Sequence, residues 1–153
     1  VDHPGTKILH KDKFSRGLGK FSAVDYIPPA EITDAEFPLT LPPGRRLQHY
    51  HSGSMTHRVA GLETLLPEEL MEIHPNDAAR AGLAEGDRAR VRSRRGEITA
   101  RVHITDRIKP GVVFLTFHFP ETAVNLLTIG ALDPVAKIPE YKATAVRVTR
   151  AES

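Results

Sequence analysis

The sequence has 153 residues, a length that fits one globular domain of ordinary size, with or without a tail. Hydrophobic residues make up 40% of the chain and charged residues 26%, which argues against a disordered, collagen-like or coiled-coil protein. No run of 18 apolar residues occurs, so no membrane span is expected. Lys and Arg number 21 against 19 Asp and Glu, and this net charge of +2 does not favour a nucleic-acid partner.

Cysteine is absent from the sequence. Its absence excludes a disulfide framework, a thiolate nucleophile and a cysteine-ligated cluster within this chain. No signal-peptide pattern occurs near Val1, and we expect a cytoplasmic location. The chain begins without Met, so a targeting signal ahead of Val1 would not be visible in this sequence.

Residues 1–45 are rich in proline and glycine, with six prolines and four glycines. Proline removes backbone donors and glycine raises the entropy lost on ordering, so long regular elements are not expected there. Residues 7–9 and 20–24 are candidates for short edge strands. We predict an extended arm over 1–45, either packed on another surface or serving as a plain linker, followed by a folded domain over 46–153.

The strongest strand pattern lies at residues 88–105. Residues 88–93 alternate arginine with small or apolar side chains, and residues 98–105 alternate again after the turn Arg94-Arg95-Gly96. Two alternating runs around a turn that contains glycine predict a β-hairpin. The apolar run 112–117 is typical of a strand buried on both faces, and residues 143–149 predict a strand with Val146 and Val148 facing inward.

Helices are predicted to be short. The segment 74–82 carries an N-cap candidate at Asn76 and a terminating glycine at Gly82, after which Leu83 would pack back on the core. Residues 85–87 predict a turn, and residues 125–128 predict another helical turn. Many short strands with small helices at the crossovers indicate a mostly β protein built as a closed or nearly closed barrel.

The densest polar cluster spans residues 49–58. Ser52, Ser54 and Thr56 offer hydroxyls, Gly53 allows close backbone approach, and Arg58 offers a forked cation. Such a loop suits an anion, above all a diphosphate, although it is not a P-loop. From these residues alone, an ordinary hydroxyl-rich loop remains the alternative.

Three histidines in the same cluster, His49, His51 and His57, raise the question of a metal site. A structural zinc site normally needs four ligands and an orienting second layer of hydrogen bonds. Cysteine is unavailable and no H-E-x-x-H pattern exists. Hydrogen-bonding roles are therefore favoured, and no metal site is predicted in this chain.

Two further places are candidates for ligand contact. Phe117 and His118 lie where a predicted buried strand ends, and Asn125 follows with an amide that can bind a heteroaromatic ring edge. An edge histidine and a helix-capping Asn125 are equally simple interpretations. Lys142 could present its charge to an anion or could simply be solvated. The basic run 92–95 is interpreted as a hydrated hairpin tip, since an RNA site would need more aromatic residues nearby than this chain has.

Taken together, these segments resemble the C-terminal domain of the molybdopterin oxidoreductase family, and within it the formate dehydrogenase alpha subunit most of all. The resemblance covers nearly the whole chain. It is carried by segments 17–21, 37–39, 44–45, 49–56, 76–78, 93–96, 125–128, 132–134, 137–142 and 145–146.

The resemblance implies a double-psi β-barrel that covers bis-molybdopterin guanine dinucleotide, with molybdenum or tungsten as the metal. It implies cofactor contacts from one loop and two later positions: His51, Ser52, Gly53, Ser54, Met55, Thr56, His57, Arg58, Asn125 and Lys142. It places Phe117 and His118 near the substrate channel.

The resemblance also implies that the catalytic residues, the metal ligand and any iron–sulfur cluster lie in upstream domains of the same polypeptide. Electron-transfer subunits are further expected partners. The parent enzyme would oxidise formate to carbon dioxide, and this chain alone would be inactive. The alternatives are the same domain of a nitrate reductase and a non-enzymatic double-psi barrel that serves as a binding module.

Overall fold

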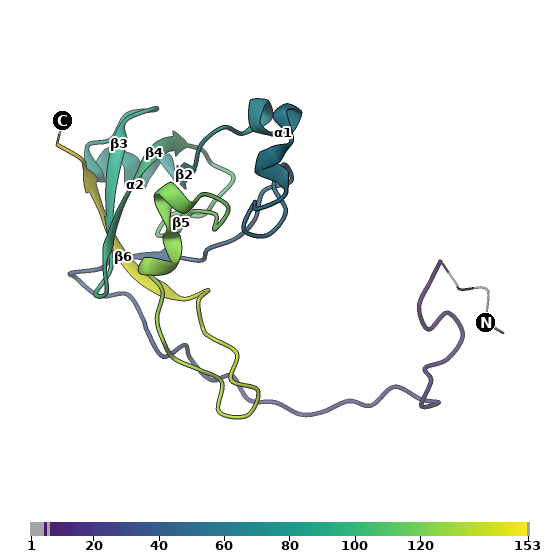
Figure 1. The fold of residues 1–153 in the computed structure, drawn as a ribbon. Helices are drawn as coiled ribbons and strands as arrows, with labels where there is room; N and C mark the ends of the chain where they lie inside the picture. Colours follow the sequence, from purple (N-terminus) through teal and green to yellow (C-terminus); the bar gives the residue numbers. More distant parts are fainter. Residues whose placement is uncertain (1–4, 6, 153) are drawn as a thin grey trace.

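The computed structural model describes residue 5 and residues 7–152, which form a β-barrel and a long arm (Figure 1). Six strands make one sheet in the order β1-β6-β3-β4-β2-β5. Their bounds are β1 Leu39–Leu41, β2 Leu70–Ile73, β3 Arg88–Arg92, β4 Glu97–Ile104, β5 Val113–Phe114 and β6 Thr144–Arg150.

The sheet closes on itself because its two outer strands, β1 and β5, meet. Thr40 forms a parallel bridge with Val112, and Gly44 forms another with Thr116. The amides of Thr40 and Gly44 each donate to a carbonyl on the β5 side at 2.9 Å. Closure removes the exposed edges of the sheet, and it confirms the barrel expected from the many short strands.

The predicted hairpin is strands β3 and β4, paired antiparallel from Arg88 opposite Arg101 to Arg92 opposite Glu97. β6 pairs with both β3 and β1, and Val146 and Val148 face inward as predicted. β2 pairs parallel with β4.

Inside the barrel, apolar side chains from every strand pack into one core. The largest fully buried ones include Leu41, Met71, Ile73, Leu115 and Val146. Burial of such side chains is the main favourable term for a domain of this size.

β5 is shorter than the strand predicted over 112–117. After Phe114 the pairing with β2 ends, and the amide of Thr116 donates to the Glu69 carboxylate at 3.0 Å. On the other side, the Leu115 carbonyl still accepts from the Gly44 amide. A buried side chain therefore replaces a neighbouring strand as the hydrogen-bond partner.

The helices are short, as expected: α1 Ala60–Leu65, α2 Pro75–Ala81, and the 3-10 turns η1 Thr56–Arg58, η2 Pro120–Thr122 and η3 Val124–Leu126. The predicted N-cap of α2 was wrong. His74 is the cap, because Pro75 already occupies the first helical position and the His74 imidazole accepts from the Asn76 amide at 3.1 Å. Gly82 ends α2 in the left-handed region with φ of +64°, and Leu83 is buried against the core as predicted. Within the described residues, no helix is long and apolar enough to cross a membrane.

The arm leaves the barrel ahead of β1 and extends into solvent (Figure 1). The two short edge strands expected within it are not present: residues 7–9 and 20–24 form no strand. A strand needs a neighbouring strand to pair with, and these two segments lie in the arm, away from the sheet (Figure 1). β1 itself falls within residues 1–45, so strand pairing begins earlier than residue 46.

Candidate functional site

Seven residues from well-separated parts of the chain line an open cavity of about 410 Å³. They are Arg45, His51, Phe117, Asn125, Thr128, Pro139 and Tyr141. The lining combines a guanidinium, an imidazole, an amide and two hydroxyls with aromatic rings. Such a set can bind an anion and the face or edge of a planar ring.

Phe117 contacts two other residues that line the cavity. It follows the buried residue Thr116, where the chain has just left β5. The Arg45 guanidinium lies 5.6 Å from the centre of its ring, and the His51 ring lies 5.5 Å away. Phe117 therefore holds a cation and an imidazole beside one aromatic surface.

His118 points the other way, into the interior, and is fully buried. One ring nitrogen accepts the Arg46 amide at 2.8 Å, and the other is hydrogen-bonded to the His51 carbonyl. Burial lowers the pKa of His118, so the neutral ring serves both bonds. The structure thus places His118 behind the cavity, where it holds the backbone that presents Arg45 and His51. Its ring does not line the cavity, and the place of His118 near a substrate channel stays a prediction.

Of the predicted loop, only His51 lines the cavity. Ser52, Ser54, Met55 and Arg58 are exposed beside it. Gly53 is buried with φ of +75°, and a side chain there would begin 2.2 Å from the His57 ring. This glycine is needed for packing within the loop.

Thr56 and His57 are engaged inside the protein. The Thr56 hydroxyl oxygen lies 3.1 Å from a His49 ring nitrogen and accepts the Tyr50 amide. His57 donates to the His118 carbonyl at 2.9 Å and bonds Glu63. The first of these bonds, then that to Glu63, raises the pKa of His57.

His49, His57 and Glu63 present ligand atoms within 4.8 Å of one another and are the group among the described residues that could hold a metal. Their ring nitrogens already have protein partners, since His49 also bonds the Leu66 carbonyl at 2.9 Å. Hydrogen bonding accounts for the cluster, and the absence of a metal site stays a prediction.

The two cofactor contacts predicted after the loop, Asn125 and Lys142, differ in their position relative to the cavity. Asn125 lies in η3 and lines the cavity, and its carbonyl accepts the Thr128 hydroxyl at 2.9 Å. Lys142 does not line the cavity. Its ammonium donates to the Pro43 carbonyl and lies 4.9 Å from the centre of the Tyr141 ring. Lys142 therefore ties the Tyr141 segment to the segment ahead of Arg45.

Four cavity residues were missed as candidates: Arg45, Thr128, Pro139 and Tyr141. Each belongs to a segment that carries the family resemblance, but none has an unusual local pattern. Only their positions in the sequence could have indicated them: Arg45 precedes the polar loop, and Thr128 ends the turn that contains Asn125.

Comparison with known proteins decides the family. A family model described as "Molydopterin dinucleotide binding domain" matches residues 39–145. The chain belongs to this family. The matched segment runs from β1 into β6 and so contains the whole cavity wall.

Similar chains are alpha subunits of formate dehydrogenases. The F420-dependent formate dehydrogenase subunit alpha of Methanocaldococcus jannaschii is 49% identical over 97% of this chain, and the F420-dependent formate dehydrogenase 1 subunit alpha of Methanococcus maripaludis is 46% identical over 97%. This chain spans only 22% of the length of either relative.

Among solved structures, acetylene hydratase from Pelobacter acetylenicus aligns with a TM-score of 0.67 at 19% identity, covering 76% of this chain and 19% of the other. This likeness concerns the fold. The mostly β barrel with short helices that the sequence predicts is confirmed.

Proposed function

We propose that the cavity is one wall of the site for bis-molybdopterin guanine dinucleotide. One observation carries the proposal. Arg45, Phe117 and Asn125 come from three distant segments of the chain and line the same cavity, within the region that the family model matches. The donor set fits this ligand: a guanidinium suits phosphate, an amide suits the edge of a pterin or guanine, and aromatic faces suit planar rings.

In that proposal, the residues of this chain bind the cofactor and orient it. His51, Asn125 and Thr128 supply hydrogen bonds, while Arg45 supplies charge that Phe117 holds in place. The exposed side chains of Ser52, Ser54, Met55 and Arg58, and the Lys142 ammonium, remain proposed contacts outside the cavity. Gly53, Thr56 and His57 keep the loop in shape, and His118 fixes its backbone.

We further propose that the complete polypeptide oxidises formate to carbon dioxide, with F420 as the electron acceptor that the names of the relatives suggest. The cofactor, with molybdenum or tungsten, would supply two-electron redox chemistry when bound. The catalytic groups and any iron–sulfur cluster would come from upstream domains, since this chain has no cysteine. A cytoplasmic location and contact with electron-transfer subunits belong to the same proposal.

The proposal is tested on the complete gene product with two matched asparagine variants. Asn125→Ala removes a cavity amide, and Asn76→Ala removes an exposed one at the start of α2. Purified proteins are assayed for pterin, as its fluorescent oxidation product, and for released guanine nucleotide. We expect Asn125→Ala to lower both contents by several-fold and Asn76→Ala to match the wild type.

Equal cofactor content in the two variants would count against the assignment of this cavity. Turnover of formate by the 153-residue chain alone, with an artificial acceptor, would show that the division of roles is wrong.

A further inference from the structure

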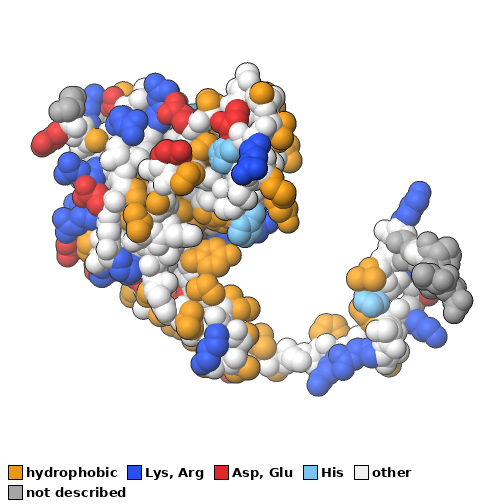
Figure 2. Space-filling model, viewed as in Figure 1, with side chains coloured by type: hydrophobic (Ala, Val, Ile, Leu, Met, Phe, Trp, Pro, Cys, Tyr) orange, Lys and Arg blue, Asp and Glu red, His pale blue; other side chains and the backbone are white. Residues whose placement is uncertain are grey.

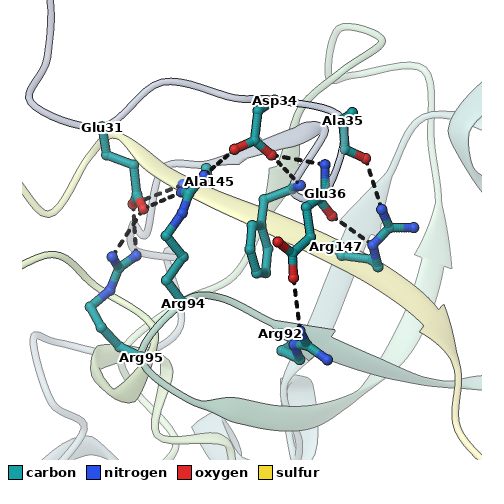
Figure 3. Close-up of polar contacts among 10 residues, drawn as sticks. Glu31, Asp34, Ala35, Glu36, Arg92, Arg94, Arg95, Ala145 and Arg147 are labelled. Atoms are coloured by element: carbon teal, nitrogen blue, oxygen red, sulfur yellow. Dashed lines mark hydrogen bonds and ion pairs between the residues drawn. The ribbon is translucent and has the colours of Figure 1, made fainter.

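The arm is tied to the barrel at its base by residues 31–36, which lie across β6 and the β3–β4 turn (Figure 3). Glu31 is 8% exposed and accepts from Arg94 and Arg95 at 2.7 Å and from the Ala145 amide at 3.1 Å. We use the name clamp for the charged residues that join residues 31–36 to the barrel. They are Glu31, Asp34 and Glu36 with Arg92, Arg94, Arg95 and Arg147.

The clamp fixes the direction in which the arm leaves. Arg147 donates to the backbone carbonyls of Ala35 and Glu36 at 2.8 and 2.6 Å, so main chain as well as side chains is held. The Arg94 guanidinium also lies 4.7 Å from the centre of the Phe37 ring. A flexible linker would not need so many directed contacts at its base.

Beyond the clamp, residues 18–27 lie away from the barrel (Figures 1 and 2). Their large apolar side chains are almost fully exposed: Leu18 89%, Phe21 100%, Val24 87%, Tyr26 85% and Ile27 83%. The segment forms no helix or strand, and no hydrogen bond among the described residues joins 18–29 to the barrel. Removing such apolar side chains from water is favourable, so this exposed series indicates a surface that another surface covers.

The pattern also indicates the shape of what covers it. In an extended chain, alternate side chains face opposite sides. Leu18, Val24 and Tyr26 would then share one side, and Phe21 and Ile27 the other. Apolar groups on both sides suit a groove better than a flat surface. Residues 7–29 hold five basic and two acidic side chains, which favours an acidic rim.

We propose that residues 18–27 dock in an apolar, acid-rimmed groove on another domain of the same polypeptide. The relatives align over 97% of this chain, the arm included, although this chain spans only 22% of their length. The arm therefore recurs in proteins that contain much additional chain for it to contact. The inference rests on the proposed function only in taking the chain as one domain of a larger polypeptide.

The experiment compares amide hydrogen exchange in the 153-residue chain and in the complete gene product, both without added cofactor. Peptides covering 18–27 should exchange at the rate of unstructured chain in the former and at least about tenfold more slowly in the latter. Phe21→Asp should restore fast exchange in the complete product. It should leave the unfolding midpoint of the 153-residue chain unchanged, since Phe21 is fully exposed there.

Leu65→Asp is the matched control, because Leu65 is an exposed apolar residue of α1 on the barrel. It should leave the protection of 18–27 intact. Equally fast exchange in both proteins would overturn the proposal. Protection that appears in the 153-residue chain as its concentration rises would also overturn it, because it would mean that copies of this chain pair through their arms. A product with a protected arm but no bound pterin would count against the proposed function alone.

Discussion

His57 and His118 show how neighbouring histidines acquire opposite roles. His118 is fully buried between two backbone groups, and burial lowers its pKa. His57 is partly exposed and donates to the His118 carbonyl and to Glu63, which raises its pKa. The difference follows from the partners of each ring. His118 accepts from the Arg46 amide and donates to the His51 carbonyl, whereas both partners of His57, a carbonyl and a carboxylate, are acceptors.

The raised pKa of His57 predicts a pH-dependent contribution to stability. The folded state binds the proton more tightly than the unfolded chain, so the contribution is complete below the unfolded value of about 6.5 and is lost as pH rises through the folded pKa. We therefore expect His57→Gln to reduce the free energy of unfolding more at pH 6 than at pH 9, as measured by urea denaturation.

Glu63→Gln provides the second variant, since it replaces the charged carboxylate that bonds His57 with a neutral amide. It should weaken this pH dependence. A cost of His57→Gln that is the same at pH 6 and pH 9 would contradict the assignment of the proton.

At the scale of elements, each helix depends on how its ends are closed. Gly82 ends α2 in the left-handed region, with the amides of Gly82 and Leu83 returning to helix carbonyls. Gly61 sits inside α1 with no positive φ, and an added Cβ would meet nothing within 4 Å. The same residue type therefore has opposite effects at the two places.

We expect Gly82→Ala to destabilise the protein by about 1 kcal/mol, because a Cβ is strained in the left-handed region. Gly61→Ala should stabilise it by roughly 0.5–1 kcal/mol, since alanine loses less backbone freedom on folding. Chemical denaturation of both variants is the measurement. Two changes of the same sign would contradict the helix-end geometry.

For the whole molecule, the central feature is how chain segments far apart in sequence are joined. The clamp links the arm to β6 and the β3–β4 turn. Burial alone would raise the pKa of Glu31, but the hydrogen bonds from Arg95, Ala145 and Arg94 outweigh it and lower that pKa. The ionised carboxylate is therefore the form that the fold holds.

Glu31→Gln should lower the free energy of unfolding at pH 7 by about 2 kcal/mol, a typical value for lost hydrogen bonds to a charged group. Because the folded pKa of Glu31 is lowered, its contribution is present above the unfolded value of about 4.5 and is lost as pH falls through the folded pKa. The difference between wild type and variant should therefore shrink in acid.

Glu36→Gln is the control for that measurement, since Glu36 forms an exposed ion pair with Arg92. Its cost should not exceed about 1 kcal/mol. Equal costs for Glu31→Gln and Glu36→Gln would show that burial does not distinguish the two carboxylates.

Local patterns were enough to predict the β3–β4 hairpin, the inward face of β6 and the turn near Asn125. Alternation of side chains and turn chemistry act over a few residues, so neighbouring sequence contains them. The N-cap of α2 and the end of β5 were not predicted. Each depends on which partner a backbone group finds, a His74 ring in one case and the distant Glu69 in the other.

By itself, the sequence determined a mostly β domain, the absence of cysteine chemistry, and a family resemblance strong enough to indicate the cofactor. Only the tertiary structure decided that Arg45, Thr128 and Tyr141 join the cavity while Lys142 stays outside it, and that His118 faces the interior. Closing the barrel sets which side of each segment is covered. That closure depends on contacts between residues more than 60 positions apart, which no local pattern records.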